Sequence, residues 1–274
     1  MQPATITIEA GRPDLRYWHD LWRSRELLLF LAWRDILLRY RQTTVGVLWS
    51  ILRPLLTMIV LTFVFSRIAK LSSAGIPYGV LVLAGLVPWQ LFSAALSNTS
   101  GSLVGSAGLI SKVYFPRLVI PLSRLIGNLV DFGIAGVLLV VLMGWFGVWP
   151  GWRIVLLPWF TLLALAAALG VGLWFGALNV KYRDFGHIVP FIAQFGLYIS
   201  PVGYASGVVP DQWRLLFSLN PMVGVIDGFR YCLLPGNQPL YWPAQVISTV
   251  TIGAMLWAGV RHFRRTERSF ADVI

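Results

Sequence analysis

The chain has 274 residues, of which 57% are hydrophobic and only 12% are charged, and its formal net charge is +11. About a quarter of the residues in an ordinary soluble domain are charged, so this composition excludes a soluble enzyme. The basic surplus does not indicate nucleic-acid binding, because most Lys and Arg residues are concentrated in alternate gaps between apolar stretches.

The N-terminal region is expected to lie outside the membrane. Residues 1–19 are polar and carry acidic side chains, which predicts a cytosolic tail rather than a cleaved signal peptide. Residues 20–42 predict an amphipathic helix, because its large apolar side chains recur at helical spacing and three arginines lie opposite. The apolar residues are Trp22, Leu29, Trp33, Ile36 and Tyr40, and the arginines are Arg23, Arg34 and Arg41. Such a helix suits the membrane–water interface, and packing against cytosolic protein is the alternative.

Residues 43–274 contain six apolar stretches of about the 20 residues that a helix needs to cross a membrane. The sequence therefore predicts an all-α polytopic membrane protein with six transmembrane helices. Because the basic residues gather before the first span, in the second and fourth gaps and after the last span, both termini are expected in the cytoplasm. The predicted spans are 48–68, 79–97, 118–147, 154–178, 187–206 and 243–262.

The gap between the last two predicted spans, residues 207–242, is long and rather apolar and is expected outside the cell. Asn220 is a favourable N-cap and Pro221 suits the first helical position, so Met222 to Leu233 reads as a short helix ended by Pro235-Gly236. This helix is too short to span a membrane, so it is expected to be re-entrant or to lie at the outer surface. Such an element is a candidate for an external gate.

The sequence carries no GxxxxGK[ST] phosphate-binding loop, no HExxH motif and no paired CxxC. The histidines His19, His187 and His262 are scattered, so no metal site is expected within one chain. Any ATP hydrolysis would need a separate subunit, because the six spans leave no room for a nucleotide-binding domain. The single cysteine, Cys232, reads as a small apolar filler.

The third predicted span contains Arg124, Asn128 and Asp131, which share one helix face. They either line a polar pathway or form a structural group in which Asn128 helps Asp131 to meet Arg124 or a neighbouring helix. The structural interpretation is favoured, because Arg124 lies near the cytosolic end and can extend to the interface. The other spans lack a chain of buried carboxylates, which argues against a proton-driven carrier.

The fifth predicted span presents Phe191, Phe195 and Tyr198 on one face. Aromatic rings can contact the C–H faces of sugars, which would suit a glycan channel. A stripe that packs against lipid or protein is the alternative.

Together, these segments resemble the membrane subunit of type-2 ABC exporters for polysaccharides, the group that exports O-antigen, capsular polysaccharide and teichoic acid. The resemblance covers nearly the whole chain, and it depends on several motifs that occur in order. They are Leu27-Leu28 to Arg39-Tyr40, Gly46-Val47-Leu48-Trp49 with Arg53-Pro54, Leu109-Ile110-Ser111-Lys112 with Phe115-Pro116-Arg117, Val180 to Asp184 with His187 and Pro190, Ser200-Pro201-Val202, Asn220-Pro221-Met222, and Glu267 to Asp272.

The resemblance implies a homodimer in the bacterial inner membrane, bound to two copies of a separate ATPase that holds ATP and Mg, with no cofactor in this chain. The chain itself would be a transport subunit and not an enzyme, and it would enclose a channel for a lipid-linked polysaccharide. By the same resemblance, the cytosolic elements that couple to the ATPase contain Ser111, Lys112, Tyr182, Arg183 and Asp184, and the external gate contains Asn220, Pro221, Asp227 and Arg230.

The basic residues Arg34, Arg39 and Arg41 of the interface helix could bind a lipid pyrophosphate, since Arg matches phosphate oxygens with paired donors, or they could attract ordinary anionic lipid. Arg183 and Asp184 could pair with the ATPase, or they could supply a topological charge and a helix N-cap.

Two other functions remain open at this point. One is a type-2 ABC permease for a drug or another lipid. The other is a membrane enzyme acting on polyprenyl phosphates, for which Asp184 and His187 are the only close cytosolic acid–histidine pair.

Overall fold

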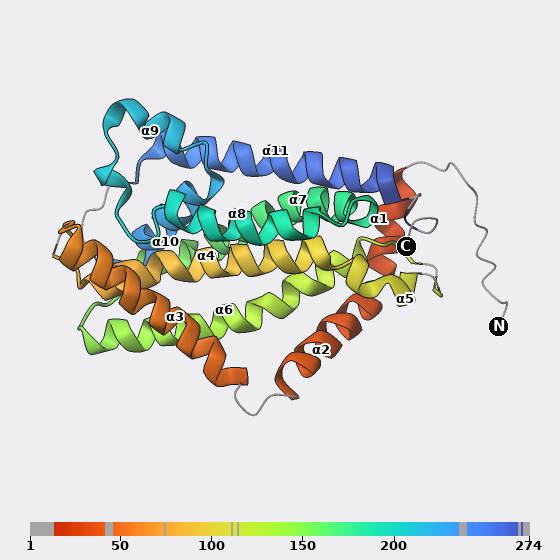
Figure 1. Ribbon diagram of the computed structural model, residues 1–274, viewed down its shortest axis with the longest axis horizontal. Coiled ribbons are helices and arrows are strands. Elements are labelled where there is room, and N and C mark those ends of the chain that lie inside the picture. The colour runs from red at the N-terminus through yellow and green to blue at the C-terminus, as the bar shows by residue number, and fades with distance from the viewer. Residues whose placement is uncertain are drawn as a thin grey trace.

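The computed structural model describes residues 14–41, 46–73, 75–110, 112–113, 115–235, 240–267 and 270, and over these residues it is all helical. Most of the long helices run along the long axis of the molecule (Figure 1). The short helix α1 (Asp14–Arg23) and the end of α11 (Trp242–Thr266) lie at one end of this bundle, and α9 (Asp211–Phe217) lies at the other.

Five helical stretches in the described part of the chain are long and apolar enough to cross a membrane, and they confirm five of the predicted spans. They are Leu48–Ile68, which combines α3 (Gly46–Thr62) with the π-helical turn η1 (Phe63–Ile68); α4 (Tyr78–Gly101); α6 (Val119–Trp145); Trp152–Lys181, which combines η3 (Trp152–Leu156) with α7 (Leu157–Lys181); and α11.

The predicted span 187–206 corresponds to α8 (Phe185–Ile199), which has only 15 residues. At 1.5 Å per residue α8 is about 22 Å long, whereas the hydrocarbon core is about 30 Å thick. The helix ends at Ser200, which has extended backbone angles and precedes Pro201. A residue before proline is disfavoured in the helical conformation, which explains the early end.

The remaining short elements are η2 (Val104–Ser106), α5 (Ala107–Ile110), η4 (Ser206–Val208) and α10 (Pro221–Leu233). The last of these confirms the short helix predicted in the external gap. The Asn220 carboxamide oxygen accepts a hydrogen bond from the Met222 backbone N–H at 3.0 Å, and Pro221 occupies the first turn. Helix α10 does not lie on the surface, because ten of its 13 residues are buried and it packs against α4, α7 and α11.

The N-terminal segment differs from the single helix predicted over 20–42. It begins at Asp14, within the predicted tail, and consists of α1 and α2 (Arg25–Arg41), which meet at Ser24. The Asp20 backbone carbonyl accepts from both the Ser24 backbone N–H and the Ser24 hydroxyl, and this type of side-chain bond often bends a helix.

The predicted apolar face of this segment is exposed at Leu29 and Trp33 of α2, as an interface helix requires, whereas Leu31 and Ala32 on another face are buried toward α6.

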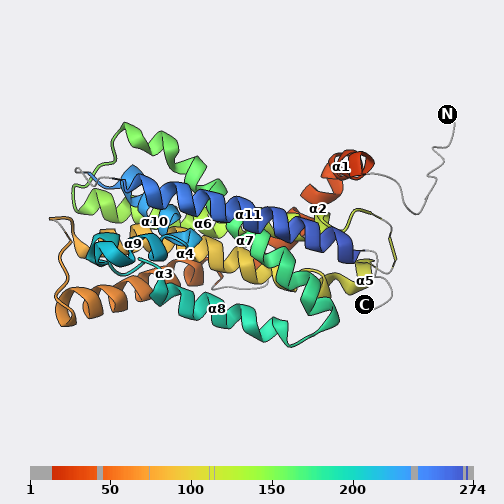
Figure 2. The ribbon, with the colours of Figure 1, turned by 90° about the horizontal axis from the view of Figure 1, so that it is seen from above.

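Helix α4 is the centre of the bundle. Of its most apolar 18-residue window 78% is buried, against 33% or less in the other four stretches. It packs against α3, α6, α7, α8 and α10, which explains why it is apolar on nearly all sides. Figure 2, seen from above, shows α3 and α8 along the lower side of the molecule, with α4 next to them toward its middle.

Helices α7 and α11 cross at two glycines. A Cβ atom on Gly259 would lie 2.1 Å from the Gly170 carbonyl oxygen, and a Cβ on Gly170 would lie 2.6 Å from the Leu256 backbone nitrogen. Small residues allow membrane helices to approach this closely, and the contact joins α11 to the rest of the bundle.

Candidate functional site

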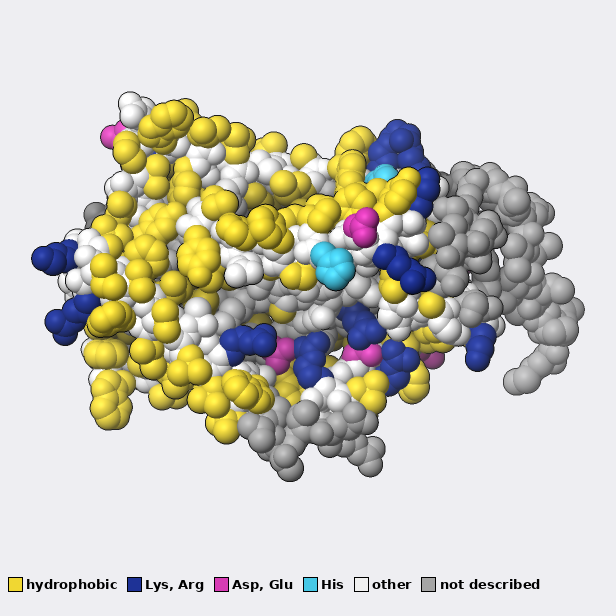
Figure 3. Space-filling view, viewed as in Figure 1, with side chains coloured by type: hydrophobic (Ala, Val, Ile, Leu, Met, Phe, Trp, Pro, Cys, Tyr) yellow, Lys and Arg dark blue, Asp and Glu magenta, His cyan; other side chains and the backbone are white. Residues whose placement is uncertain are grey.

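A half-open groove of about 610 Å³ runs along one face of the bundle. Its walls come from α2, α3, α6 and the middle of α8, and its floor comes from α4. Figure 3 shows this face as mostly apolar, with basic and acidic side chains gathered at the lower edge of a depression. A groove with charged lining on an apolar membrane protein is a candidate pathway for a polar molecule.

The floor of the groove is a polar strip on the otherwise buried helix α4. Gln90, Ser93 and Ser97 recur at helical spacing, so they share one face, and all three are only half-buried. The Ser93 hydroxyl donates to the backbone carbonyl of Gln90 at 3.2 Å. The strip therefore offers side-chain donors and acceptors to the groove over about two helical turns.

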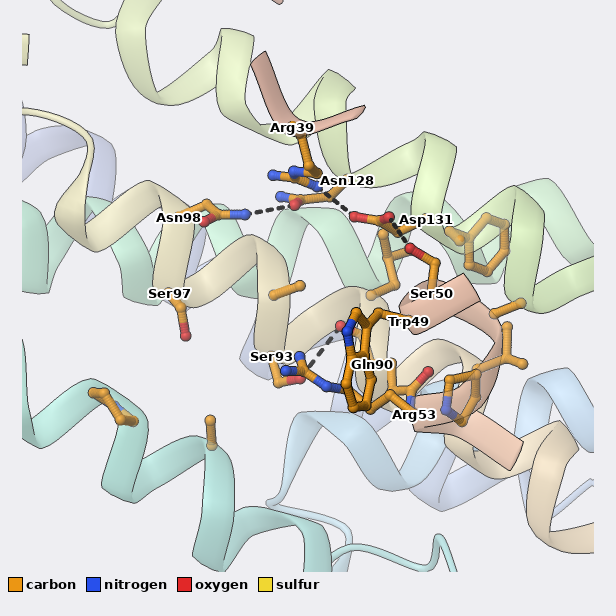
Figure 4. Close-up of a pocket in the computed structure, with 18 residues that line it drawn as sticks. Arg39, Trp49, Ser50, Arg53, Gln90, Ser93, Ser97, Asn98, Asn128 and Asp131 are labelled. Atoms are coloured by element: carbon orange, nitrogen blue, oxygen red, sulfur yellow. Dashed lines mark hydrogen bonds and ion pairs between the residues drawn. The ribbon is translucent and has the colours of Figure 1, made fainter. Parts of the chain in front are cut away.

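Asp131 of α6 joins three elements at the wall of the groove (Figure 4). Its carboxylate forms an ion pair with Arg39 of α2, and it accepts hydrogen bonds from the Tyr40 hydroxyl and, at 3.1 Å, from the Ser50 hydroxyl of α3. The carboxylate thus connects α2 and α3 to α6.

The other two residues of the predicted triad bind elsewhere. Arg124 forms an ion pair with Asp35 of α2 at 3.1 Å, and Asp35 also pairs with Arg34. Asn128 accepts a hydrogen bond from the Asn98 side-chain amide of α4 at 2.6 Å. Asp131 therefore meets a neighbouring helix rather than Arg124. The pathway interpretation also applies in part, because Asn128 and Asp131 line the groove.

Two of the three arginines predicted to bind a lipid pyrophosphate, Arg34 and Arg39, have side chains that the structure describes. Arg34 and Arg39 are engaged with carboxylates of the same chain, which partly neutralises them. Arg39 also lines the groove. The side chain of Arg41 lies outside the described part of the structure. Their proposed contact with a lipid pyrophosphate stays a prediction.

The aromatic residues predicted to line a channel share one exposed face of α8. Phe191 and Phe195 have ring centroids 4.1 Å apart, and Phe191, Phe195 and Tyr198 are all about half exposed or more. Within one chain they do not line the groove, to which α8 contributes Pro190 and Ala193 instead.

The bundle end that holds α1 contains a junction of three segments around Glu267, which follows α11. The Glu267 carboxylate accepts hydrogen bonds from the Arg117 backbone N–H at 2.8 Å and from the Tyr17 hydroxyl at 3.2 Å. Burial raises the pKa of the Glu267 carboxyl and, together with the Glu267 charge, the pKa of the Tyr17 hydroxyl. Arg264 stacks over the Tyr17 ring at 4.6 Å. Two motifs of the resemblance, at 115–117 and 267–270, thus meet in space.

The residues predicted to couple to an ATPase are exposed where the structure describes them. Lys112, Tyr182, Arg183 and Asp184 all lie on the surface, and Ser111 lies outside the described residues. Asp184 occupies the N-cap position of α8, but its side chain makes no capping hydrogen bond. Among the described residues, Arg183 and Asp184 form no ion pair.

The predicted gate residues lie at the opposite end of the bundle and are joined by short contacts. The Arg230 guanidinium is buried and donates to three backbone carbonyls, those of Leu81, Val202 and Tyr204, at 3.3, 2.9 and 2.8 Å. Asp227 accepts from the Ser206 hydroxyl at 2.8 Å, and the Asn220 amide donates to the Ser200 hydroxyl at 2.9 Å. These residues fix the chain after α8 onto α4 and α10.

Residues 26–234 match the family of ABC-2 type transporters. The chain belongs to this family of membrane proteins. It is 30% identical over 262 residues to the O-antigen export system permease protein RfbA of Myxococcus xanthus, covering 95% of this chain and 100% of that protein. A protein of the same name from Klebsiella pneumoniae is 27% identical over 259 residues, with 91% and 95% covered. The polysialic acid transport protein KpsM of Escherichia coli is 26% identical over 215 residues, with 76% and 80% covered.

Several residues of this site in the ABC-2 family chain have no role predicted from the sequence. They are Asp35, Ser50 and the polar strip of α4. The strip had a signal, because polar residues at spacing 3 and 4 in a predicted span lie on one face. Asp35 had no such signal, since its partner Arg124 is 89 positions away in the sequence.

Proposed function

We propose that this chain is the transmembrane subunit of an ATP-driven exporter that moves a lipid-linked polysaccharide, similar to O-antigen, from the cytosol across the bacterial inner membrane. Family membership and the names of the related permeases support this function. The structural observation that carries it is the half-open groove with a charged lining, on a face of the bundle that is mostly apolar (Figure 3).

A homodimer fits the open side of this groove. One chain provides walls and a floor, and a second copy related by a twofold axis would supply the opposite wall. In such a dimer the exposed face of α8, with Phe191, Phe195 and Tyr198, would border the shared space and contact sugar rings. Aromatic faces bind C–H groups without fixing the hydroxyls, which suits a polymer that slides.

The sixth membrane crossing in this proposal consists of α8 together with the turn that follows it. Non-helical backbone at membrane depth needs hydrogen-bond partners within the protein. Arg230 supplies them to the carbonyls of Val202 and Tyr204, so the turn is suited to such an environment. With six crossings both termini face the cytoplasm, and α10 with Asn220, Pro221, Asp227 and Arg230 forms the external gate.

ATP binding and hydrolysis, with Mg, belong in this proposal to two copies of a separate ATPase. The exposed residues Lys112, Tyr182, Arg183 and Asp184, with Ser111, would form the docking surface on the cytosolic side. Arg183 and Asp184 are exposed and form no ion pair with any residue that the structure describes, which supports this assignment, because a partner can bind them without first breaking such a pair.

The test is an affinity purification of this chain from native membranes in mild detergent, with the partners identified and counted. One ATPase copy per copy of this chain is the expected result, and recovery of the chain without an ATPase under several gentle conditions would contradict the proposal.

An Arg183→Ala variant should recover less ATPase, whereas Arg67→Ala, which removes an exposed arginine at the opposite end of the bundle, should recover as much as the wild type. Equal recovery with both variants would remove Arg183 from the docking surface.

A further inference from the structure

The side chains that line the groove carry two positive charges and one negative charge. The charged side chains among its lining residues are Arg39, Arg53 and Asp131. Arg39 is paired with Asp131, which leaves the charge of Arg53. Among the described residues, none forms an ion pair or a side-chain hydrogen bond with the Arg53 guanidinium.

Arg53 is exposed to the groove and lies near the start of the first membrane span, where a counter-charge would be favourable. It lies five residues after Leu48, the first residue of the span, which is about 7.5 Å along the helix axis. An arginine within a membrane helix is expensive unless it faces a polar cavity or a partner. Arg53 lines the groove, and Figure 4 shows its side chain pointing from α3 toward α4, next to Trp49.

The floor of the groove on α4 supplies neutral hydrogen-bonding groups that line the same space as Arg53. The Gln90 side chain is half-buried, and no hydrogen bond of its amide group is found in the described part of the chain. Ser93 and Ser97 follow on the same face of α4. A guanidinium with amide and hydroxyl donors across a groove is the combination that binds phosphate or carboxylate oxygens.

We propose that Arg53, with Gln90, Ser93 and Ser97, forms an anion-binding subsite that takes a phosphate or carboxylate group of the transported molecule. The inference rests on the proposed export function and adds a residue-level recognition site to it. It also differs from recognition by the interface helix, because Arg34 and Arg39 already hold carboxylates of the same chain. The anion can come from the phosphate of a lipid carrier or from an acidic group of the glycan.

The test measures equilibrium binding to the full chain, purified with its ATPase and placed in nanodiscs of neutral phosphatidylcholine. One probe is radiolabelled farnesyl pyrophosphate, and the other is a glucuronic acid oligosaccharide without lipid. The variants are Arg53→Gln, Arg53→Lys and the control Arg67→Gln, which removes an exposed arginine from the far end of the same span.

For at least one probe, Arg53→Gln should weaken binding about tenfold or more, as expected for loss of a charge-assisted hydrogen bond. Arg53→Lys should retain part of the affinity, because it keeps the charge and loses the paired donors. Arg67→Gln should bind as the wild type does. The probe that depends on Arg53 identifies the source of the anion, the carrier lipid or the glycan.

Binding of both probes that is unchanged in Arg53→Gln would overturn the inference, as would an equal loss in Arg67→Gln. If Arg53→Gln does not fold, the Arg53→Lys variant decides: unchanged affinity for both probes overturns the inference, and a partial loss supports it. These outcomes are distinct from failure of the proposed function, which would appear earlier as the absence of an ATPase from the purified complex.

Discussion

Replacing Gly259 by alanine should destabilise the bundle, whereas the same change at Gly253 on the same helix should not. The added Cβ at Gly259 would lie 2.1 Å from the Gly170 carbonyl oxygen. Carbon–oxygen contacts in proteins are about 3.3 Å or longer, so the helices would have to separate by about 1.2 Å. The obstacle is backbone, which cannot rotate away as a side chain can. Overpacking of this kind costs about 1–3 kcal/mol.

The control variant Gly253→Ala measures the intrinsic effect on stability of replacing a helical glycine by alanine. Nothing lies within 4 Å of a Cβ at Gly253, and alanine in a helix is favoured over glycine by about 0.5–1 kcal/mol. Gly253→Ala should therefore be as stable as the wild type or more stable. The difference in unfolding free energy between the two variants is therefore the overpacking cost, about 1–3 kcal/mol, which is roughly 2–12 °C in Tm for a chain of this size.

Thermal unfolding of both proteins in the same detergent, followed by size-exclusion chromatography, measures this difference. Equal Tm values for Gly259→Ala and Gly253→Ala would refute the close crossing of α7 and α11. The reciprocal variant Gly170→Ala should behave like Gly259→Ala, because its Cβ would lie 2.6 Å from the Leu256 backbone nitrogen.

Three further variants test the junctions of the molecule by thermal unfolding. Because burial holds the pKa of Glu267 above its ordinary value of 4.5, the folded chain binds this proton more tightly than the unfolded chain, and its stabilising contribution falls as the pH rises above 4.5. The Tm of the wild type minus that of Glu267→Gln should therefore decrease from about pH 4 to pH 7, and a constant difference would contradict the buried carboxyl. Asp131→Asn should lower the free energy of unfolding by about 1–2 kcal/mol, because it removes the carboxylate that pairs with the partly buried Arg39. Asp211→Asn, which breaks an exposed ion pair, should lower it by at most about 0.5 kcal/mol. Equal losses in the two variants would contradict the network around Asp131. Asn220→Ala should cost about 1 kcal/mol by removing the N-cap of α10, and an unchanged Tm would show that this cap does not hold the helix.

The local elements of this protein could be predicted well from its sequence. A stretch of about 20 apolar residues has few options in a membrane other than a helix, so five spans were found within a few residues of their bounds. The α10 helix followed from Asn220 and Pro221, whose effects on a helix start are local. Where a local signal such as a proline interrupted a long apolar stretch, the predicted bounds of the span were less accurate. Helix α8 ends at Ser200 before Pro201, although the apolar stretch continues.

The partners of the polar residues were decided by tertiary structure. The sequence placed Arg124, Asn128 and Asp131 on one face, but only the packing of α2, α3 and α4 against α6 determined what each one binds.

The sequence by itself therefore determined which segments are helical membrane spans and placed the chain near a family of polysaccharide exporters. Only the tertiary structure decided that a groove exists, that Gln90 and Arg53 face it, and that Glu267 joins three distant segments. The physical reason is that hydropathy and capping act over a few neighbouring residues. Pairing of charges and closeness of helices depend on residues far apart in the chain, and no local pattern records them.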